Sequence, residues 1–290
     1  MRARAAACHD ARMISRWHDW VASGRNLRLF SHDIFVRAAG TGSPLLFLHG
    51  FPTSSFDFAA IAPALEAKHR CIYFDFLGFG ASDKPALHYD YELQTNIAIA
   101  VAQAHGLERA TVVAHDYGVT VGQELLAREA EGRVPFALDA MVFLNGGLCA
   151  ALHRPILVQK LFASAAGPLA ARLLTSKRMF ARSMREIIRR MDRFDVDEHY
   201  QTITPRRMPA LLGYIAERKR KHERYEGALR DTAVPLAFAW GLEDPVSGAH
   251  ALAWARAAAP RAQVTALAGV GHYPQLEAPE QVVAAIEAAG

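Results

Sequence analysis

Short apolar runs alternate with longer helix-like stretches along the first half of the chain, and this alternation restricts the fold more than any other feature. Each run has the length and composition of a strand buried on both faces. Such strands, separated by helices, form a parallel sheet covered by helices on both sides. The predicted fold class is therefore α/β, with a mostly parallel central sheet. The runs lie at residues 44–48, 70–76, 110–114 and 140–144, the helix-like stretches at 91–105 and 118–130.

The ends of the chain extend the same pattern. Two short strands joined by a tight turn are expected at residues 27–30 and 33–38, before the first buried run. Two more strands are expected late in the chain, at residues 234–240 and 263–267. A helix over residues 279–289 then closes the sheet domain.

The rhythm stops between about residues 148 and 231, where only helix-like stretches rich in Leu, Arg and Met occur. A helical insertion between two sheet strands predicts a cap over one edge of the sheet. The stretches lie at residues 155–163, 168–174, 184–194 and 208–221. We expect a helical cap over residues 148–230 and an α/β core made of residues 1–147 and 231–290, with residues 1–16 as an extension.

Composition and charge fit one soluble domain with an inserted piece. The chain has 290 residues, 51% of them hydrophobic, which is enough for a large core. The net charge of +4 is mildly basic and does not suggest a nucleic-acid partner. Basic residues cluster at 182–193 and 218–224, and because acids interrupt both clusters, solvated helix faces are the favoured interpretation.

Cysteine usage and hydropathy bear on location. The three cysteines, Cys8, Cys71 and Cys149, are odd in number and form no CxxC, which predicts reduced thiols and a cytoplasmic protein. No apolar run approaches the roughly 20 residues that span a bilayer. The Arg- and Ala-rich N-terminus has no apolar segment typical of a secretory signal. We expect no membrane span, and the sequence leaves the oligomeric state open.

The pentapeptide AHDYG, residues 114–118, joins a predicted strand to a predicted helix. Small residues, Ala114 and Gly118, stand two positions before and after Asp116, as a strained nucleophile elbow requires. Such elbows hold serine in G-x-S-x-G, whereas this chain has an acid there. Asp244 and His272 follow, each just past a predicted strand, in the order nucleophile, acid, histidine. This order predicts a catalytic triad.

Less specific interpretations compete at several of these positions. Taken alone, Asp116 reads equally well as a helix N-cap. Glu243 is the rival of Asp244 for the acid. His49 is interpreted as a structural hydrogen-bonding residue, and His115 as one that packs or bonds locally. The stretch GFGASD, residues 78–83, lacks the third glycine and the ribose-binding acid of a dinucleotide site.

The chain resembles the α/β-hydrolases of the aspartate-nucleophile branch, which includes the epoxide hydrolases and haloalkane dehalogenases. Within that branch, residues 145–161 and 211–221 resemble the mesoderm-specific transcript proteins most closely. The likeness runs from about Trp17 to the C-terminus. The matching segments are HGFPTSS (49–55), DFLGFGASDKP (75–85), AHDYG (114–118), WGLEDP (240–245) and GVGHYPQLE (269–277).

The residue types indicate the chemistry that this branch performs. The carboxylate of Asp116 is ionised at neutral pH and attacks a saturated carbon, which gives an alkyl ester. His272 then activates a water that hydrolyses the ester, and Asp244 orients His272. The resemblance implies that the backbone N–H groups of Phe51 and Tyr117 form the oxyanion hole. A cis Phe51–Pro52 bond is plausible in that turn. This mechanism requires no cofactor and no metal.

The leaving group is decided by other residues. Dehalogenases of the branch usually hold a halide with a Trp directly after the nucleophile and an Asn in the HG turn or a Trp in the cap. In this chain Tyr117 directly follows the predicted nucleophile, and Phe51 occupies the position of the Asn in the HG turn. The four tryptophans lie outside the predicted cap, at residues 17, 20, 240 and 254. The usual pair of halide donors is therefore missing.

An opening epoxide instead leaves as an alkoxide, which needs a proton donor such as a tyrosine. The predicted cap offers three candidates: Tyr200, Tyr214 and Tyr225. We therefore favour hydrolysis of an epoxide on a small apolar organic substrate. A haloalkane or haloacid dehalogenase with an atypical halide pocket and a non-catalytic scaffold of the same fold remain alternatives. A serine esterase is disfavoured, because no G-x-S-x-G occurs.

Overall fold

The computed structural model describes residues 16–152, 154 and 176–290. Within these residues, eight strands form one sheet: β1 (Arg25–Leu29), β2 (His32–Ala39), β3 (Pro44–Leu48), β4 (Arg70–Phe74), β5 (Arg109–Asp116), β6 (Ala137–Gly146), β7 (Leu236–Gly241) and β8 (Gln263–Leu267). Their order across the sheet is β1-β2-β4-β3-β5-β6-β7-β8. β2 runs antiparallel to β1 and β4, and the other neighbouring pairs are parallel. The predicted fold class is confirmed.

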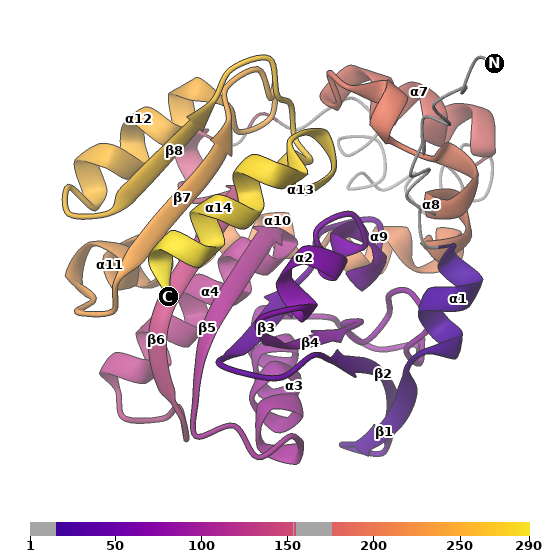
Figure 1. Ribbon diagram of the computed structural model, residues 1–290, viewed down its shortest axis with the longest axis horizontal. Helices are drawn as coiled ribbons and strands as arrows, with labels where there is room; N and C mark the ends of the chain where they lie inside the picture. The colour runs from indigo at the N-terminus through magenta and orange to yellow at the C-terminus, as the bar shows by residue number, and fades with distance from the viewer. Residues whose placement is uncertain (1–15, 153, 155–175) are drawn as a thin grey trace, which may run out of the picture.

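Neighbouring residues of the central strands face opposite sides of the sheet and enter two separate hydrophobic cores. In β3, Leu46 belongs to the core covered by α3 (Tyr91–Ala104) and α4 (Tyr117–Ala130). Phe47 belongs to the other core, which α14 (Pro279–Ala289) covers. Figure 1 shows α14 in front of the sheet, with α3 and α4 behind it. Burial on both faces explains why the strands read as unbroken apolar runs.

The inserted helical region lies between β6 and β7. Its described helices are α7 (Lys177–Ile187), α8 (Val196–Thr202), α9 (Met208–Leu211), α10 (Tyr214–Arg220) and α11 (His222–Asp231). α11 packs on α4 of the core. α8 lies beside the N-terminal helix α1 (Trp17–Ala22), as Figure 1 shows, and the backbone N–H of Trp17 donates to Glu198 Oε2 at 2.7 Å. The insertion is thus fastened to the core at two separate places.

Two of the predicted cap helices differ from the structure. The helix expected over residues 184–194 ends at Ile187, because the backbone N–H groups of the residues that follow donate hydrogen bonds to a carboxylate of the core. Glu277 Oε2 accepts from the N–H of Arg189 at 2.8 Å and of Arg190 at 3.1 Å. The helix expected over residues 208–221 is divided into α9 and α10. The helices expected at residues 155–163 and 168–174 lie outside the described residues.

The core follows the prediction more closely, with local differences. β3 and β8 have the predicted bounds. β4 ends at Phe74 rather than Phe76, because the carboxylate of the next residue, Asp75, accepts from the N–H of Ser55, earlier in the chain, and of Ala81 in the following loop, and the chain turns away from the sheet. The prediction missed four helices of the core: α1, α2 (Ala62–Glu66), α12 (Ala249–Ala258) and α13 (Pro274–Glu277). No helix in the described part of the chain combines the length and apolar character needed to cross a bilayer.

Candidate active site

Asp116 is the last residue of β5 and forms a strained turn into α4, which begins at Tyr117. Its φ of 46° and ψ of −104° are unusual for any residue other than glycine. The turn leaves no room for larger side chains nearby. A Cβ on Gly118 would lie 2.3 Å from the carbonyl oxygen of Leu48, and one on Gly50 would lie 2.8 Å from Cβ of Asp116. The small flanking residue at position 118 is therefore required by close packing against β3.

The structure brings the three predicted triad residues into contact. His272 Nε2 lies 3.2 Å from Asp116 Oδ2, and His272 Nδ1 lies 2.7 Å from Asp244 Oδ2. Asp116 ends β5, Asp244 follows β7, and His272 follows β8, so three strands deliver their side chains to the carboxyl edge of the sheet. All three residues are at least nine-tenths buried. The arrangement has the geometry of a nucleophile, a base and an orienting acid.

Asp244 is fixed by several donors besides His272. Ser247 Oγ donates to its Oδ2 at 2.6 Å, and the N–H of Val246 donates to its Oδ1 at 2.8 Å. Asn145 Nδ2 donates to Oδ2 at 3.0 Å from the end of β6. Glu243, the rival acid, is exposed and accepts from the N–H of Gly269 at 3.0 Å. These contacts favour Asp244 as the partner of His272.

The turn after β3, predicted to form the oxyanion hole, approaches Asp116. The backbone N–H of Phe51 donates to Asp116 Oδ1 at 2.7 Å, and the Phe51–Pro52 bond is cis, as expected. Tyr117 begins α4 directly after Asp116, where helix N–H groups lack intrahelical partners. The two carboxylate oxygens of Asp116 therefore have different surroundings, with Oδ1 at the turn after β3 and Oδ2 at His272.

The two other histidines near the site have structural contacts, as expected. His49 Nε2 accepts from the N–H of Phe76 at 3.0 Å, so its Nδ1 carries the proton and donates to the carbonyl of Gly50 at 2.8 Å. His115 Nε2 lies 2.8 Å from the carbonyl oxygen of His272. Burial lowers the pKa of His115 to about 4. A neutral His115 thus supports the loop that carries His272.

Electrostatics couple the charges of the triad. Burial alone would lower the pKa of His272, but the charges and hydrogen bonds of Asp244 and Asp116 outweigh it and hold this pKa well above its usual value of 6.5. Burial would likewise raise the pKa of Asp116, but His272, His115 and the Phe51 N–H outweigh it and hold this pKa below its usual value. The resting site therefore favours an ionised Asp116 beside an imidazolium.

The three tyrosines predicted to bind substrate have different neighbours. Tyr214 is 2% exposed, and its ring centroid lies 6.1 Å from that of Phe51 and 5.2 Å from that of Tyr117. Tyr214 therefore packs on both residues of the predicted oxyanion hole. Its pKa is raised well above 10 by burial and by the charge of Asp116.

Tyr225 and Tyr200 are placed differently. The hydroxyl of Tyr225 donates to Glu217 Oε1 at 3.4 Å, and its ring packs on Tyr91, with 5.7 Å between centroids. Tyr200 lies on α8 and packs against Phe180 of α7, with 5.8 Å between centroids. Tyr214 is thus the tyrosine whose ring packs on Phe51 and on Tyr117, the residue after Asp116.

Several residues of the site were missed in the sequence. Asn145 and Ser247, which bind Asp244, carried no distinguishing pattern, although Asn145 stands at the carboxyl end of a predicted strand. Glu277 was noted only as the last residue of the family-like segment GVGHYPQLE, residues 269–277. Its carboxylate is 1% exposed and accepts from the N–H groups of Gly271 and Tyr273, on either side of His272. It therefore fixes the loop that carries His272.

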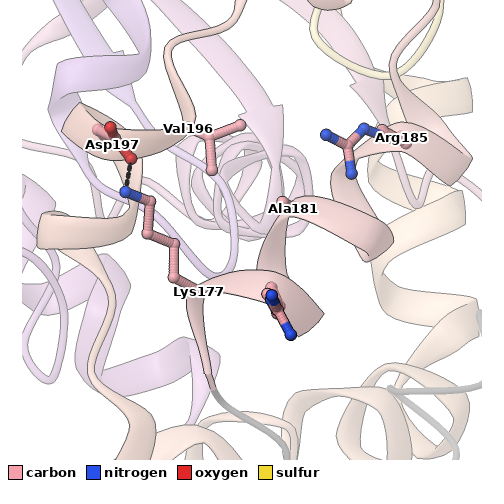
Figure 2. A pocket seen from close by; sticks show the side chains of 6 residues that line it. Lys177, Ala181, Arg185, Val196 and Asp197 are labelled. Carbon is pink, nitrogen blue, oxygen red and sulfur yellow. Dashed lines mark ion pairs between the residues drawn. The ribbon is translucent and has the colours of Figure 1, made fainter.

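A separate hollow lies on the cap between α7 and α8. Figure 2 shows it bridged by an ion pair between Lys177 and Asp197, with Arg185 on another side. None of the predicted site residues lines it. Among the described residues, no group of three or more His, Cys, Asp and Glu side chains is placed to hold a metal ion.

Known proteins resemble this chain in both sequence and fold. LipZ of Mycobacterium tuberculosis (strain ATCC 25618 / H37Rv) is 41% identical over 273 residues, which cover 90% of this chain and 93% of LipZ. The Homo sapiens mesoderm-specific transcript homolog protein is 35% identical over 283 residues, covering 90% of this chain and 84% of that protein. The solved structure of the epoxide hydrolase CorEH without ligand has a TM-score of 0.76 at 19% identity, covering 92% of this chain and 97% of that chain.

The family assignment rests on most of the chain. The family model described as "Alpha/beta hydrolase family" matches residues 45–285, from β3 to within α14. This span includes the elbow, the triad and the inserted helices. The chain belongs to the alpha/beta hydrolase family.

Proposed function

We propose that this chain is an epoxide hydrolase-type enzyme that forms a transient ester between Asp116 and its substrate. The observation that carries the proposal is the position of the Asp116 carboxylate. One oxygen accepts from the N–H of Phe51 at 2.7 Å, and the other faces His272 Nε2 at 3.2 Å. Asp116 makes no side-chain cap contact with α4, so it does not act as a helix cap. A carboxylate held in this way is suited to act as an oxygen nucleophile beside a base.

The two oxygens of Asp116 take different roles. Oδ2 attacks a ring carbon of the epoxide, the C–O bond of the ring breaks, and the ring oxygen leaves as an alkoxide. Oδ1 becomes the carbonyl oxygen of the ester and remains at the N–H of Phe51. When water later adds to this ester, the negative charge develops on Oδ1, where Phe51 and Tyr117 supply backbone donors.

Ester formation also changes His272. The charge of Asp116 helps to hold the pKa of His272 above 6.5 in the resting site. Alkylation removes that charge, so the pKa of His272 falls and the imidazolium releases its proton. The neutral ring then takes a proton from a water that attacks Cγ of Asp116, while Asp244 stabilises the imidazolium that forms. One chemical step thereby prepares the base for the next.

Tyr214 supplies the proton that the alkoxide needs, and the tyrosinate that remains takes up the proton that His272 releases. Burial and the charge of Asp116 raise the pKa of the Tyr214 hydroxyl, so it stays protonated in the resting site. Alkylation of Asp116 removes one of these two causes and makes the hydroxyl a stronger acid just as the alkoxide forms. The packing of Tyr214 on Phe51 and Tyr117 supports this role.

The test is a single turnover in oxygen-18 water with enzyme in excess over a panel of epoxides. The ester route places the label in the carboxylate of Asp116, and peptide mass spectrometry locates it there. Label that enters only the diol excludes the covalent route. Bromoalkanes tested in parallel distinguish the alternative, because bromide release without diol formation from any epoxide identifies a dehalogenase. Asp116→Asn is the control and takes up no label in the first turnover.

A further inference from the structure

Arg218 is a buried cation of the cap that the proposed reaction does not use. It lies on α10 and is 4% exposed, although the sequence pattern had assigned residues 218–224 to a solvated face. Its Nε is buried without a hydrogen-bond partner. No ion pair among the described residues includes it, whereas Lys221 pairs with Glu217 and Arg224 with Glu124. Long cationic side chains are rarely buried in this way unless they are paired.

The acidic residues of the described part of the chain offer Arg218 little compensation. Residues 140–185, which lead from β6 through the first half of the insertion, include no Asp and no Glu. The neighbouring acid, Glu217, accepts from the N–H of Tyr91 at 3.0 Å and from Lys221 Nζ at 2.9 Å. A guanidinium removed from water without a counter-charge is unfavourable. An anion from outside the chain would supply what the protein lacks.

The guanidinium of Arg218 lies beside residues that contact the proposed active site. A Cβ on Gly147 would fall 1.6 Å from Nη1, so the glycine leaves the space that the guanidinium occupies. Gly147 follows Gly146, which pairs with Asp116 across β5 and β6. Arg218 Cζ also lies 5.9 Å from the centroid of Tyr214, the proposed proton donor.

We propose that Arg218 binds a carboxylate group of the substrate and so positions the reacting carbon at Asp116. This inference rests on the proposed function and names its substrate class, small organic acids with a reactive saturated carbon. A carboxylate fits because its two oxygens match the planar fork of one guanidinium. Its single charge also balances a single cation, whereas a phosphate monoester carries nearly two charges at neutral pH.

The first test measures binding of unreactive probes, so it does not depend on turnover. Phenylacetate and phenylacetamide have nearly the same shape and differ in charge. Calorimetry should give the wild-type protein at least a tenfold preference for the acid, and Arg218→Met should abolish that preference while keeping the amide affinity. Lys219→Met is the matched control, because it removes one charge from the exposed side of the same helix and should keep the preference.

A second variant separates position from charge. Gly147→Ala keeps every charge but puts a methyl group where Nη1 lies, so it should reduce the preference for phenylacetate as Arg218→Met does. Arg218→Lys should keep part of the preference. Thermal unfolding without ligand completes the set: Arg218→Met should melt no lower than the wild type, because the lost cation has no acidic partner among the described residues.

Three outcomes overturn the inference. In the first, the wild type shows no preference for phenylacetate, including the case in which neither probe binds. In the second, Arg218→Met retains the preference. In the third, Arg218→Met melts at a lower temperature and loses binding of both probes together, which shows that Arg218 is a structural residue. Failure here together with label at Asp116 in oxygen-18 water leaves the proposed function intact. A charge preference without any label supports acid binding at a site that forms no ester.

Discussion

Glu277 gives the sharpest prediction, because its single carboxylate joins the catalytic loop to the cap. Oε2 accepts from the N–H groups of Gly271, Arg189 and Arg190 at 2.9, 2.8 and 3.1 Å, and Oε1 accepts from Tyr273 at 3.1 Å. Gly271 and Tyr273 flank His272, and the N–H of His272 itself donates to the carbonyl of Ile187 in the cap at 2.9 Å. The carboxylate is therefore expected to hold the imidazole at its distance from Asp116.

The effect of Glu277→Gln follows from this bonding pattern. The amide oxygen can take the place of Oε2, but the amide nitrogen then faces the N–H of Tyr273, and one bond is lost at about 1–3 kcal/mol. The three remaining bonds lose the assistance of the negative charge, about 1 kcal/mol each. The neutral amide is easier to bury than a carboxylate, which offsets part of this loss. We expect a net destabilisation of about 2–3 kcal/mol.

Two assays test this expectation. Thermal unfolding of Glu277→Gln should show a Tm lowered by about 5–10 °C relative to the wild type. The kcat on any epoxide that the wild type hydrolyses should fall more than KM changes, because the misplaced His272 slows ester hydrolysis. Glu223→Gln, an exposed acid on α11, is the control and should match the wild type in both. A Glu277→Gln protein with unchanged kcat would refute the role assigned to this carboxylate.

Three further predictions concern other residues of the site and its border. Asn145→Ala removes a donor to Asp244 and leaves the N–H of Gly241 without its acceptor, so it should lower the free energy of unfolding by about 1–3 kcal/mol and also lower kcat; unchanged kcat contradicts this. Tyr214→Phe keeps the ring packing but loses the hydroxyl, so epoxide turnover should fall steeply while Tm stays within a few degrees; equal rates would exclude Tyr214 as proton donor. Burial lowers the pKa of His199 to about 4 in the folded protein, so the unfolded chain binds more protons between pH 6.5 and 4 and stability should decrease as pH falls through that window. His199→Phe should remove about 3 kcal/mol of this dependence in urea unfolding at several pH values, and an identical pH dependence of the variant would disprove it.

Sequence reasoning succeeded where the physical signal is local. The strands β3 and β8 were predicted with their observed bounds, because short apolar runs closed by turn residues have few other interpretations. The elbow was also visible, since the small residue at 118 is required by packing against the neighbouring strand. The order of Asp116, Asp244 and His272 along the chain then matched their meeting at one edge of the sheet.

Sequence reasoning failed where one side chain from a distant part of the sequence decides the local structure. The helix expected over residues 184–194 stops at Ile187 because Glu277, far away in the sequence, binds the next amides. The basic cluster at 218–224 looked solvated, but the way α10 packs on the core buries Arg218. Asn145 was overlooked because a single Asn at a strand end has many possible roles, and only the register of β6 beside β7 reveals its partner.

The central claim is the ester at Asp116, and His272→Gln tests it most directly. Without the imidazole the ester should form but not hydrolyse. Intact-protein mass spectrometry after incubation with an epoxide that the wild type turns over should show a mass increase equal to one whole substrate molecule. Peptide mapping should place it on Asp116, and the Asp116→Asn, His272→Gln double variant should show none. An unmodified His272→Gln protein, or an adduct on another residue, would contradict the account.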